Sequence, residues 1–215
     1  MTLSFDLFWS FRSPYSYLAT ARIVSLRDEY DLQVNLRPVY PIAIRNEEFF
    51  ASVNPLWPGY LLRDTVRIAE RLGMAYHWPR PDPVYRDPET RRYPKEQPFI
   101  HRLTRLGVEA HQLGRGLEFI DEVSKTLFGG TENWHKGDHL SDAAKRAGLD
   151  LAAMDKAIEA DAGEYEAVIE ANQQALHDAG HWGVPTMVFE GEPFFGQDRI
   201  EDLIWRLERN GLARR

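Results

Sequence analysis

Residues 180–203, GHWGVPTMVFEGEPFFGQDRIEDL, contain the pattern that decides the fold. Residues 186–189 form a short apolar run typical of a strand, and residues 190–192 have the composition of a tight turn. Residues 193–195 indicate a second strand, after which Asp198 is expected to cap a final helix. The segment therefore predicts a β-hairpin followed by a helix.

The N-terminal segment predicts a strand, a turn and a helix. Apolar side chains recur at every second position along residues 3–9, which is the period of a strand with one buried face. Ser13 and Pro14 then stand where a helix should begin, with serine at the N-cap and proline at the first helical position. Residues 34–39 indicate a second strand, and the proline-bearing residues 38–58 indicate a loop.

The middle of the chain predicts a block of helices. From residue 58 to about residue 180 the apolar residues recur with helical spacing, which fits five or six helices. Six prolines within residues 78–98 interrupt them and predict a surface loop that could cover a site. The C-terminal hairpin would complete the sheet begun at the N-terminus. We therefore expect a discontinuous α/β domain, residues 1–45 and 183–215, with an inserted all-helical domain, residues 46–182.

Composition limits what the chain can do. Its 215 residues include 43% hydrophobic and 27% charged residues, as in a folded globular protein. A net charge of −7 opposes binding to nucleic acid or to anionic membranes. No signal-like segment or membrane span is visible, which predicts a cytoplasmic protein. Cysteine is absent, which excludes disulfides, thiolate metal sites and a dithiol redox cycle. Any sulfur chemistry must therefore come from a bound thiol.

The first candidate site is the start of the first helix, at residues 13–16, SPYS. Backbone N–H groups and the helix dipole favour an anion there. The Ser13 hydroxyl could donate a hydrogen bond to a bound thiolate and lower the pKa of that thiol. The alternative interpretation is that Ser13 is only a helix cap.

Two further candidates lie in the C-terminal segment. A cis Val184-Pro185 bond would present the N–H and C=O of Val184 to an extended peptide, and the alternative is an ordinary trans entry into the strand. Gln197 and Asp198 follow Gly196 at another helix start, where Asp198 could be only a cap.

Three stretches in this order resemble a known superfamily: FWSFRSPYSYLA at residues 8–19, YLLRDTVRIAERLG at residues 60–73, and the C-terminal segment quoted above. The sequence resembles DsbA-like thioredoxin proteins, and among them the kappa-class glutathione transferases and 2-hydroxychromene-2-carboxylate isomerases. The resemblance covers essentially the whole chain. It implies a thioredoxin-like fold with an inserted all-helical domain, and a homodimer.

The resemblance also implies a function and its residues. Ser13 would face the sulfur of glutathione, and Val184 and Pro185 would pair with its cysteinyl backbone. Gln197 and Asp198 would receive its γ-glutamyl end. The implied activity is a glutathione-dependent isomerase or transferase that acts on a small aromatic or unsaturated substrate.

The chain departs from the isomerase pattern around Asn54 and Trp57, in a shortened loop without the usual lysine. Both residues are candidates for the lining of the site, and the alternative is that they are solvent-exposed loop positions. Gln197 also stands where serine or asparagine is more familiar, so we expect recognition of the γ-glutamyl end to differ in detail. The physiological substrate therefore stays open.

Other interpretations also remain. The chain could be a cysteine-less thioredoxin-fold binding protein without activity, or Ser13 could act as a covalent nucleophile. Histidine pairs at 135/139 and 177/181 have the spacing of helical metal ligands. Glycines 137 and 180 interrupt both pairs and no third ligand is evident, so we predict surface or capping roles and no metal site.

Overall fold

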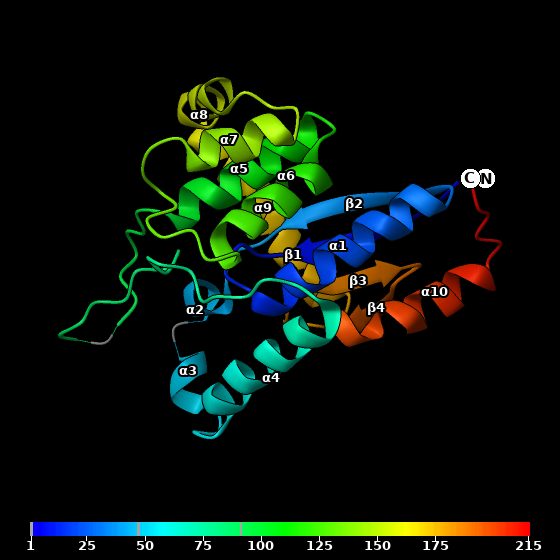
Figure 1. The fold of residues 1–215 in the computed structure, drawn as a ribbon, viewed down its shortest axis with the longest axis horizontal. Coiled ribbons are helices and arrows are strands. Elements are labelled where there is room, and N and C mark those ends of the chain that lie inside the picture. The colour runs from blue at the N-terminus through cyan, green and yellow to red at the C-terminus, as the bar shows by residue number, and fades with distance from the viewer. Residues whose placement is uncertain (1, 47, 91) are drawn as a thin grey trace.

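The two ends of the chain build one sheet, as the sequence predicts. The computed structural model describes residues 2–46, 48–90 and 92–215. In this part of the chain the strands form a four-stranded sheet in the order β2-β1-β3-β4 (Figure 1). β1 pairs in parallel with β2 and antiparallel with β3, and β3 pairs antiparallel with β4. The strands are β1 (Leu3–Trp9), β2 (Leu32–Pro38), β3 (Thr186–Phe189) and β4 (Glu192–Phe195).

The predicted hairpin and first helix are confirmed. The β3–β4 turn places Glu190 at φ 49° and Gly191 at φ 80°, the left-handed conformation that a two-residue hairpin turn requires. The first helix, α1 (Pro14–Glu29), has Ser13 as its N-cap and Pro14 in its first turn. It connects β1 to the parallel strand β2.

The inserted block is helical, as predicted, but it begins earlier than expected. Two short helices, Ile42–Arg45 and Phe49–Ser52, occupy the stretch predicted as loop. Pro41 is compatible with the first because it is the N-cap residue, where no helical N–H bond is lost, and the second contains no proline. The helices of the block are α2 (Ile42–Arg45), α3 (Phe49–Ser52), α4 (Trp57–Leu72), α5 (Ile100–Gln112), α6 (Gly116–Phe128), α7 (His139–Arg146), α8 (Leu151–Ala160) and α9 (Ala162–Asp178). The predicted loop at residues 78–98 is confirmed, since none of its described residues is helical or in a strand of the sheet.

The predicted cap at Asp198 is wrong. Asp198 lies inside the 3₁₀ turn η1 (Gln197–Arg199), which leads into α10 (Ile200–Glu208). Its carboxylate pairs with Arg199 at 3.2 Å instead of bonding to a helix N–H group. The left-handed Gly196, at φ 109°, turns the chain just before η1, so the 3₁₀ turn takes the place of a side-chain cap.

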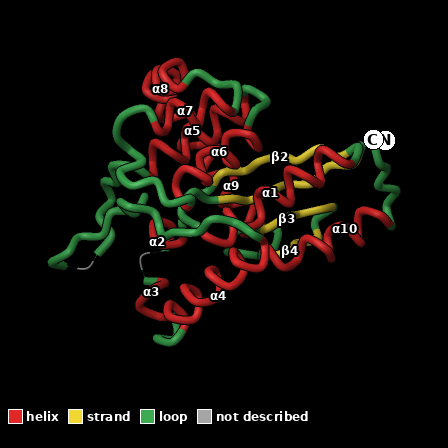
Figure 2. The backbone as a smooth tube through the Cα atoms, in the orientation of Figure 1, coloured by secondary structure: helices red, strands yellow, loops and turns green. Residues whose placement is uncertain are grey.

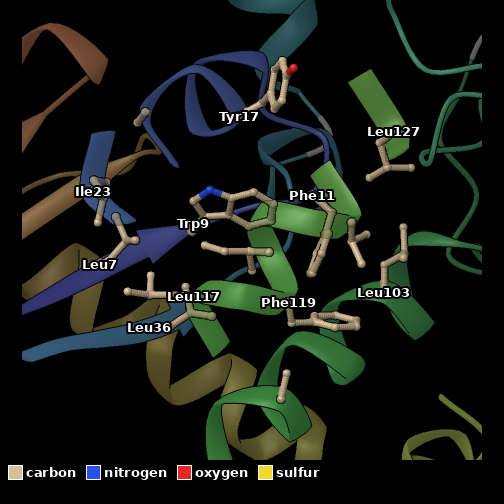
Figure 3. Packing of buried hydrophobic residues seen from close by; sticks show 14 of the residues in the cluster. Leu7, Trp9, Phe11, Tyr17, Ile23, Leu36, Leu103, Leu117, Phe119 and Leu127 are labelled. Atoms are coloured by element: carbon tan, nitrogen blue, oxygen red, sulfur yellow. The ribbon is translucent and has the colours of Figure 1, made fainter. Parts of the chain in front are cut away.

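The helical block packs directly on the sheet. Helices α5, α6 and α9 lie together beside β2 and contact it, whereas α4 and α10 lie on the opposite side in this view (Figure 1). One continuous cluster of buried side chains joins the sheet to the helices. Figure 3 shows its centre, where Phe11 lies between Trp9 and Phe119, with ring centroids 4.7 and 6.1 Å away. The domain boundaries at 45/46 and 182/183 remain a prediction.

The alternation along residues 3–9 predicts one buried face, but the structure buries both faces near the end of β1. Phe8, on the face predicted to be open, is 1% exposed and packs with Val39 and Leu176. Leu176 belongs to α9, so a helix far along the chain covers this second face.

The two ends of the chain lie side by side (Figure 2). The N–H of Arg215 donates to the carbonyl of Glu29, and the N–H of Asp31 donates to the carbonyl of Ala213. The C-terminal tail is therefore attached where α1 passes into β2. No helix within the described ranges is both long and apolar enough to cross a membrane.

Candidate functional site

Ser13 connects the start of α1 to the loop before β3. Its hydroxyl oxygen accepts the Ser16 N–H at 3.2 Å, which makes it the N-cap of α1. The same hydroxyl donates to the carbonyl of Val184 at 3.1 Å. The Val184-Pro185 bond is cis, as we expect from the sequence. Two of the predicted site segments, 171 residues apart in the chain, therefore meet at the mouth of α1.

Ser13 and Val184 line a cavity of about 690 Å³. Its walls come from the start of α1, from α2 to α4, from the loop at residues 78–98 and from residues 182–184. Most of the lining is apolar, including Pro14, Ile42, Phe50, Trp57, Leu61 and Trp182. A cavity of this size and character suits a small organic ligand.

An ion pair holds the 78–98 loop against this cavity. Arg12 donates to both carboxylate oxygens of Asp82, at 2.8 and 2.9 Å, and the Trp78 indole N–H donates to the same carboxylate at 3.1 Å. Burial alone would lower the pKa of Arg12, but Asp82 and the nearby Tyr93 outweigh it and raise the pKa. The loop that the sequence suggested as a cover therefore does form part of the cavity wall.

Tyr15 joins the start of α1 to α4. Its hydroxyl donates to the Asp64 carboxylate at 2.7 Å. Burial, together with this carboxylate, raises the pKa of Tyr15. Burial would also raise the pKa of Asp64, but the hydrogen bonds from Tyr15 and Arg67 outweigh it and lower that pKa. Tyr15 is therefore protonated and Asp64 ionised at neutral pH, and the phenol can act as a hydrogen-bond donor but not as a base.

Aromatic side chains form a connected group at the cavity. Phe49 contacts both Trp57 and Trp182, with ring centroids 6.0 and 5.1 Å away, and Phe50 contacts Trp57 and Tyr93. Trp57 thus lines the cavity, as the sequence suggested.

Asn54, the other candidate from that loop, does not line the cavity. Its side-chain oxygen accepts the N–H of Leu56 at 3.0 Å, and the residue is exposed. Its role is to shape the turn before α4.

The structure leaves Gln197 and Asp198 outside the cavity lining. Gln197 is 5% exposed, and its backbone carbonyl accepts from Arg22 at 2.7 Å. Asp198 is exposed and paired with Arg199. Pro185 does not line the cavity either, but its carbonyl accepts the N–H of Gly196 at 2.9 Å. The 196–198 turn therefore adjoins the Val184-Pro185 loop, and its role toward a ligand stays a prediction.

Sequence reasoning did not identify Arg45 as a cation of the cavity. Arg45 lies at the end of α2, in a stretch predicted as loop, and lines the cavity. It donates to two backbone carbonyls, those of Tyr40 and Trp182. Burial lowers the pKa of Arg45 to about 10, which leaves it charged at neutral pH. No local signal in the sequence distinguishes it from a surface arginine.

The histidine pairs do not assemble a metal site in the part of the chain that the structure describes, where no group of three or more His, Cys, Asp or Glu residues is placed to hold an ion. His139 begins α7 and His177 lies in α9, whereas His181 stacks on Phe195 with centroids 4.0 Å apart.

Solved structures with the same fold include 2-hydroxychromene-2-carboxylate isomerase, with a TM-score of 0.72, 19% identity, and coverage of 96% of this chain and 95% of that one. A probable DsbA oxidoreductase from Streptomyces coelicolor matches with a TM-score of 0.66 and 18% identity, over 96% and 89% of the two chains. The cytosolic disulfide reductase DsbM from Pseudomonas aeruginosa, solved with GSH, matches with a TM-score of 0.60 and 15% identity, over 96% and 100%. A comparison with curated proteins finds no match. The model of the DSBA-like thioredoxin domain matches residues 5–208, so the chain belongs to this family.

Proposed function

We propose that this protein is a glutathione-dependent isomerase or transferase in which Ser13 stabilises the glutathione thiolate. The observation that carries the proposal is the contact of the Ser13 hydroxyl with the Val184 carbonyl, at the mouth of a helix and in the wall of an apolar cavity. Because the chain has no cysteine, a thiol at this position must be supplied by a ligand. Two relatives of this fold are an isomerase and a reductase solved with GSH.

The residues present fit a bound glutathione. The N–H of Val184 has no acceptor among the described residues, and its C=O is bonded only to a side-chain hydroxyl that can rotate. Both groups are thus suited to pair with the cysteinyl backbone of a tripeptide. We propose that Gln197 and Asp198, next to this loop, bind the γ-glutamyl end of glutathione.

When bound, glutathione supplies a thiolate that can add reversibly to a conjugated double bond of the second substrate. The Ser13 hydroxyl and the positive end of the α1 dipole lower the free energy of the charged sulfur. The Tyr15 hydroxyl donates its single proton to ionised Asp64, and this bond fixes the Tyr15 ring in the cavity wall. The aromatic walls at Trp57 and Trp182 can hold a flat apolar substrate. We also propose that the protein is a homodimer and is located in the cytoplasm.

A second function is favoured by one specific observation. The Ser13 hydroxyl already makes two structural bonds, to Ser16 and to Val184, which is what a helix cap in a catalytically inactive binding protein would do. The cysteine-less binding protein therefore stays as the alternative.

Calorimetric titration with reduced glutathione, with S-methylglutathione as the control, tests the proposal together with a screen of chromene carboxylates and unsaturated acids. Binding combined with glutathione-dependent turnover supports the enzyme. Binding without turnover favours the alternative, and no binding of glutathione at all overturns the enzyme and also favours the alternative.

A further inference from the structure

Arg45 is a cation in the cavity wall that the proposed function does not use. Its Nε donates to the Tyr40 carbonyl at 2.6 Å, and its Nη2 donates to the Trp182 carbonyl at 2.9 Å. Both acceptors are neutral, and no described carboxylate forms an ion pair with it. A guanidinium has five N–H donors, so three remain for a ligand.

The surroundings of Arg45 make an anionic ligand favourable. A charge beside apolar walls is costly unless a counter-charge pairs with it. Among the described residues that line the cavity, only Asp82 has a carboxylate. Both oxygens of this carboxylate already accept hydrogen bonds from Arg12. The cavity therefore presents a guanidinium with unused donors and no partner of opposite charge among the residues that the structure describes.

The position of Arg45 relative to Ser13 is fixed through one short segment. Arg45 bonds to the carbonyl of Trp182, and Ser13 bonds to the carbonyl of Val184, two residues further on. The Cα atoms of residues two positions apart are separated by at most about 7 Å. A molecule of modest size can therefore reach both the Ser13 hydroxyl and the Arg45 guanidinium.

We propose that Arg45 binds the carboxylate of a ligand in this cavity, so that the site selects acids over neutral compounds of the same shape. The planar fork of a guanidinium matches the two oxygens of a carboxylate. This inference deepens the proposed function and rests on it for the identity of the thiol. The carboxylate can belong to glutathione itself or to an aromatic second substrate.

Two matched ligand pairs distinguish these sources by direct binding, without any turnover. One pair is trans-cinnamate and cinnamamide, which differ in charge but little in shape. The other is reduced glutathione and its glycine amide. Each ligand is titrated against wild type, Arg45→Met, Arg45→Lys and Arg71→Met, the last being an exposed arginine outside the cavity lining.

In wild type, at least one acid should bind about tenfold to a hundredfold more tightly than its amide, the range expected for a hydrogen-bonded charge pair. Arg45→Met should remove that preference and leave affinity for the amide unchanged. Arg45→Lys should keep part of it, and Arg71→Met all of it. The pair that shows the effect identifies the source of the carboxylate.

A preference that survives in Arg45→Met overturns the inference, as does a wild type that does not discriminate within either pair. If Arg45→Met fails to fold, the carboxylate of cinnamate or glutathione in wild-type crystals must lie within hydrogen-bond distance of Arg45, and a carboxylate found elsewhere refutes the assignment. Cinnamate preference without any glutathione binding would refute the proposed function and leave the role of Arg45 intact.

Discussion

Replacing Ser13 by alanine tests the proposed role of its hydroxyl most directly. The side chain has two bonds to lose, one that caps α1 through Ser16 and one to the carbonyl of Val184. Loss of a helix cap costs about 1 kcal/mol. Loss of a hydrogen bond between neutral groups costs a further amount of about 1 kcal/mol. We expect Ser13→Ala to keep the fold and lose about 2 kcal/mol of unfolding free energy.

The effect on the thiolate follows from the single proton of the hydroxyl. A hydrogen bond to a charged partner contributes about 1.5–3 kcal/mol, which corresponds to about one to two pKa units on the bound sulfur. In the structure this proton is directed to Val184, so it must turn to reach the sulfur. If a ligand N–H takes its place on the Val184 carbonyl, the full effect is expected. If none does, the lost bond reduces the effect to less than about one unit.

The assay is the ultraviolet absorbance of the thiolate as a function of pH for bound glutathione, corrected with S-methylglutathione. The pKa of the bound thiol should be higher in Ser13→Ala than in wild type. Ser13→Gly removes the hydroxyl but remains an acceptable helix cap, so it should match Ser13→Ala in this titration and lose less stability. Ser13→Thr keeps a hydroxyl and should remain closer to wild type.

Coincident titration curves for wild type and Ser13→Ala, with glutathione bound to both, would refute the reasoning. Ser13 would then be a structural cap only, and the binding-protein alternative would be favoured.

Three further substitutions test the architecture around the site. Tyr15→Phe removes the hydrogen bond to ionised Asp64 and should cost about 1–3 kcal/mol near pH 7. Because the pKa of Asp64 is lowered in the folded protein, the difference from wild type in chemical denaturation should shrink as the pH falls below about 4. Gly183→Ala would place a Cβ atom 2.8 Å from Cζ of Phe195 and should displace that ring. We expect the free energy of unfolding to fall by about 1–3 kcal/mol, and an unchanged melting temperature would contradict this. Leu7→Ala, at a side chain with 0% exposure in the central strand, should cost about 2–5 kcal/mol in a denaturant titration, whereas a loss below about 1 kcal/mol would show that the core had closed around the site.

The sequence alone determined the features that depend on near neighbours. The Ser13 cap and Pro14 start α1 because both act on N–H groups within one turn. The Glu190-Gly191 turn joins two strands because its two residues adopt the left-handed conformation that a tight hairpin needs. The same local patterns gave the order of the strands and of the longer helices but not α2 and α3, and the lack of cysteine excluded dithiol chemistry without any structure.

Only the tertiary structure decided which side chains face the cavity. Arg45 meets Trp182 across 137 residues, and Arg12 meets Asp82 across 70, and neither contact leaves a periodic signal in the sequence. Gln197, for which the resemblance implies contact with the γ-glutamyl end of glutathione, is buried with its carbonyl on Arg22, and its role toward a ligand stays a prediction. The physical reason is that backbone propensity acts over a few residues, whereas the direction and charge partner of a side chain depend on everything that packs around it.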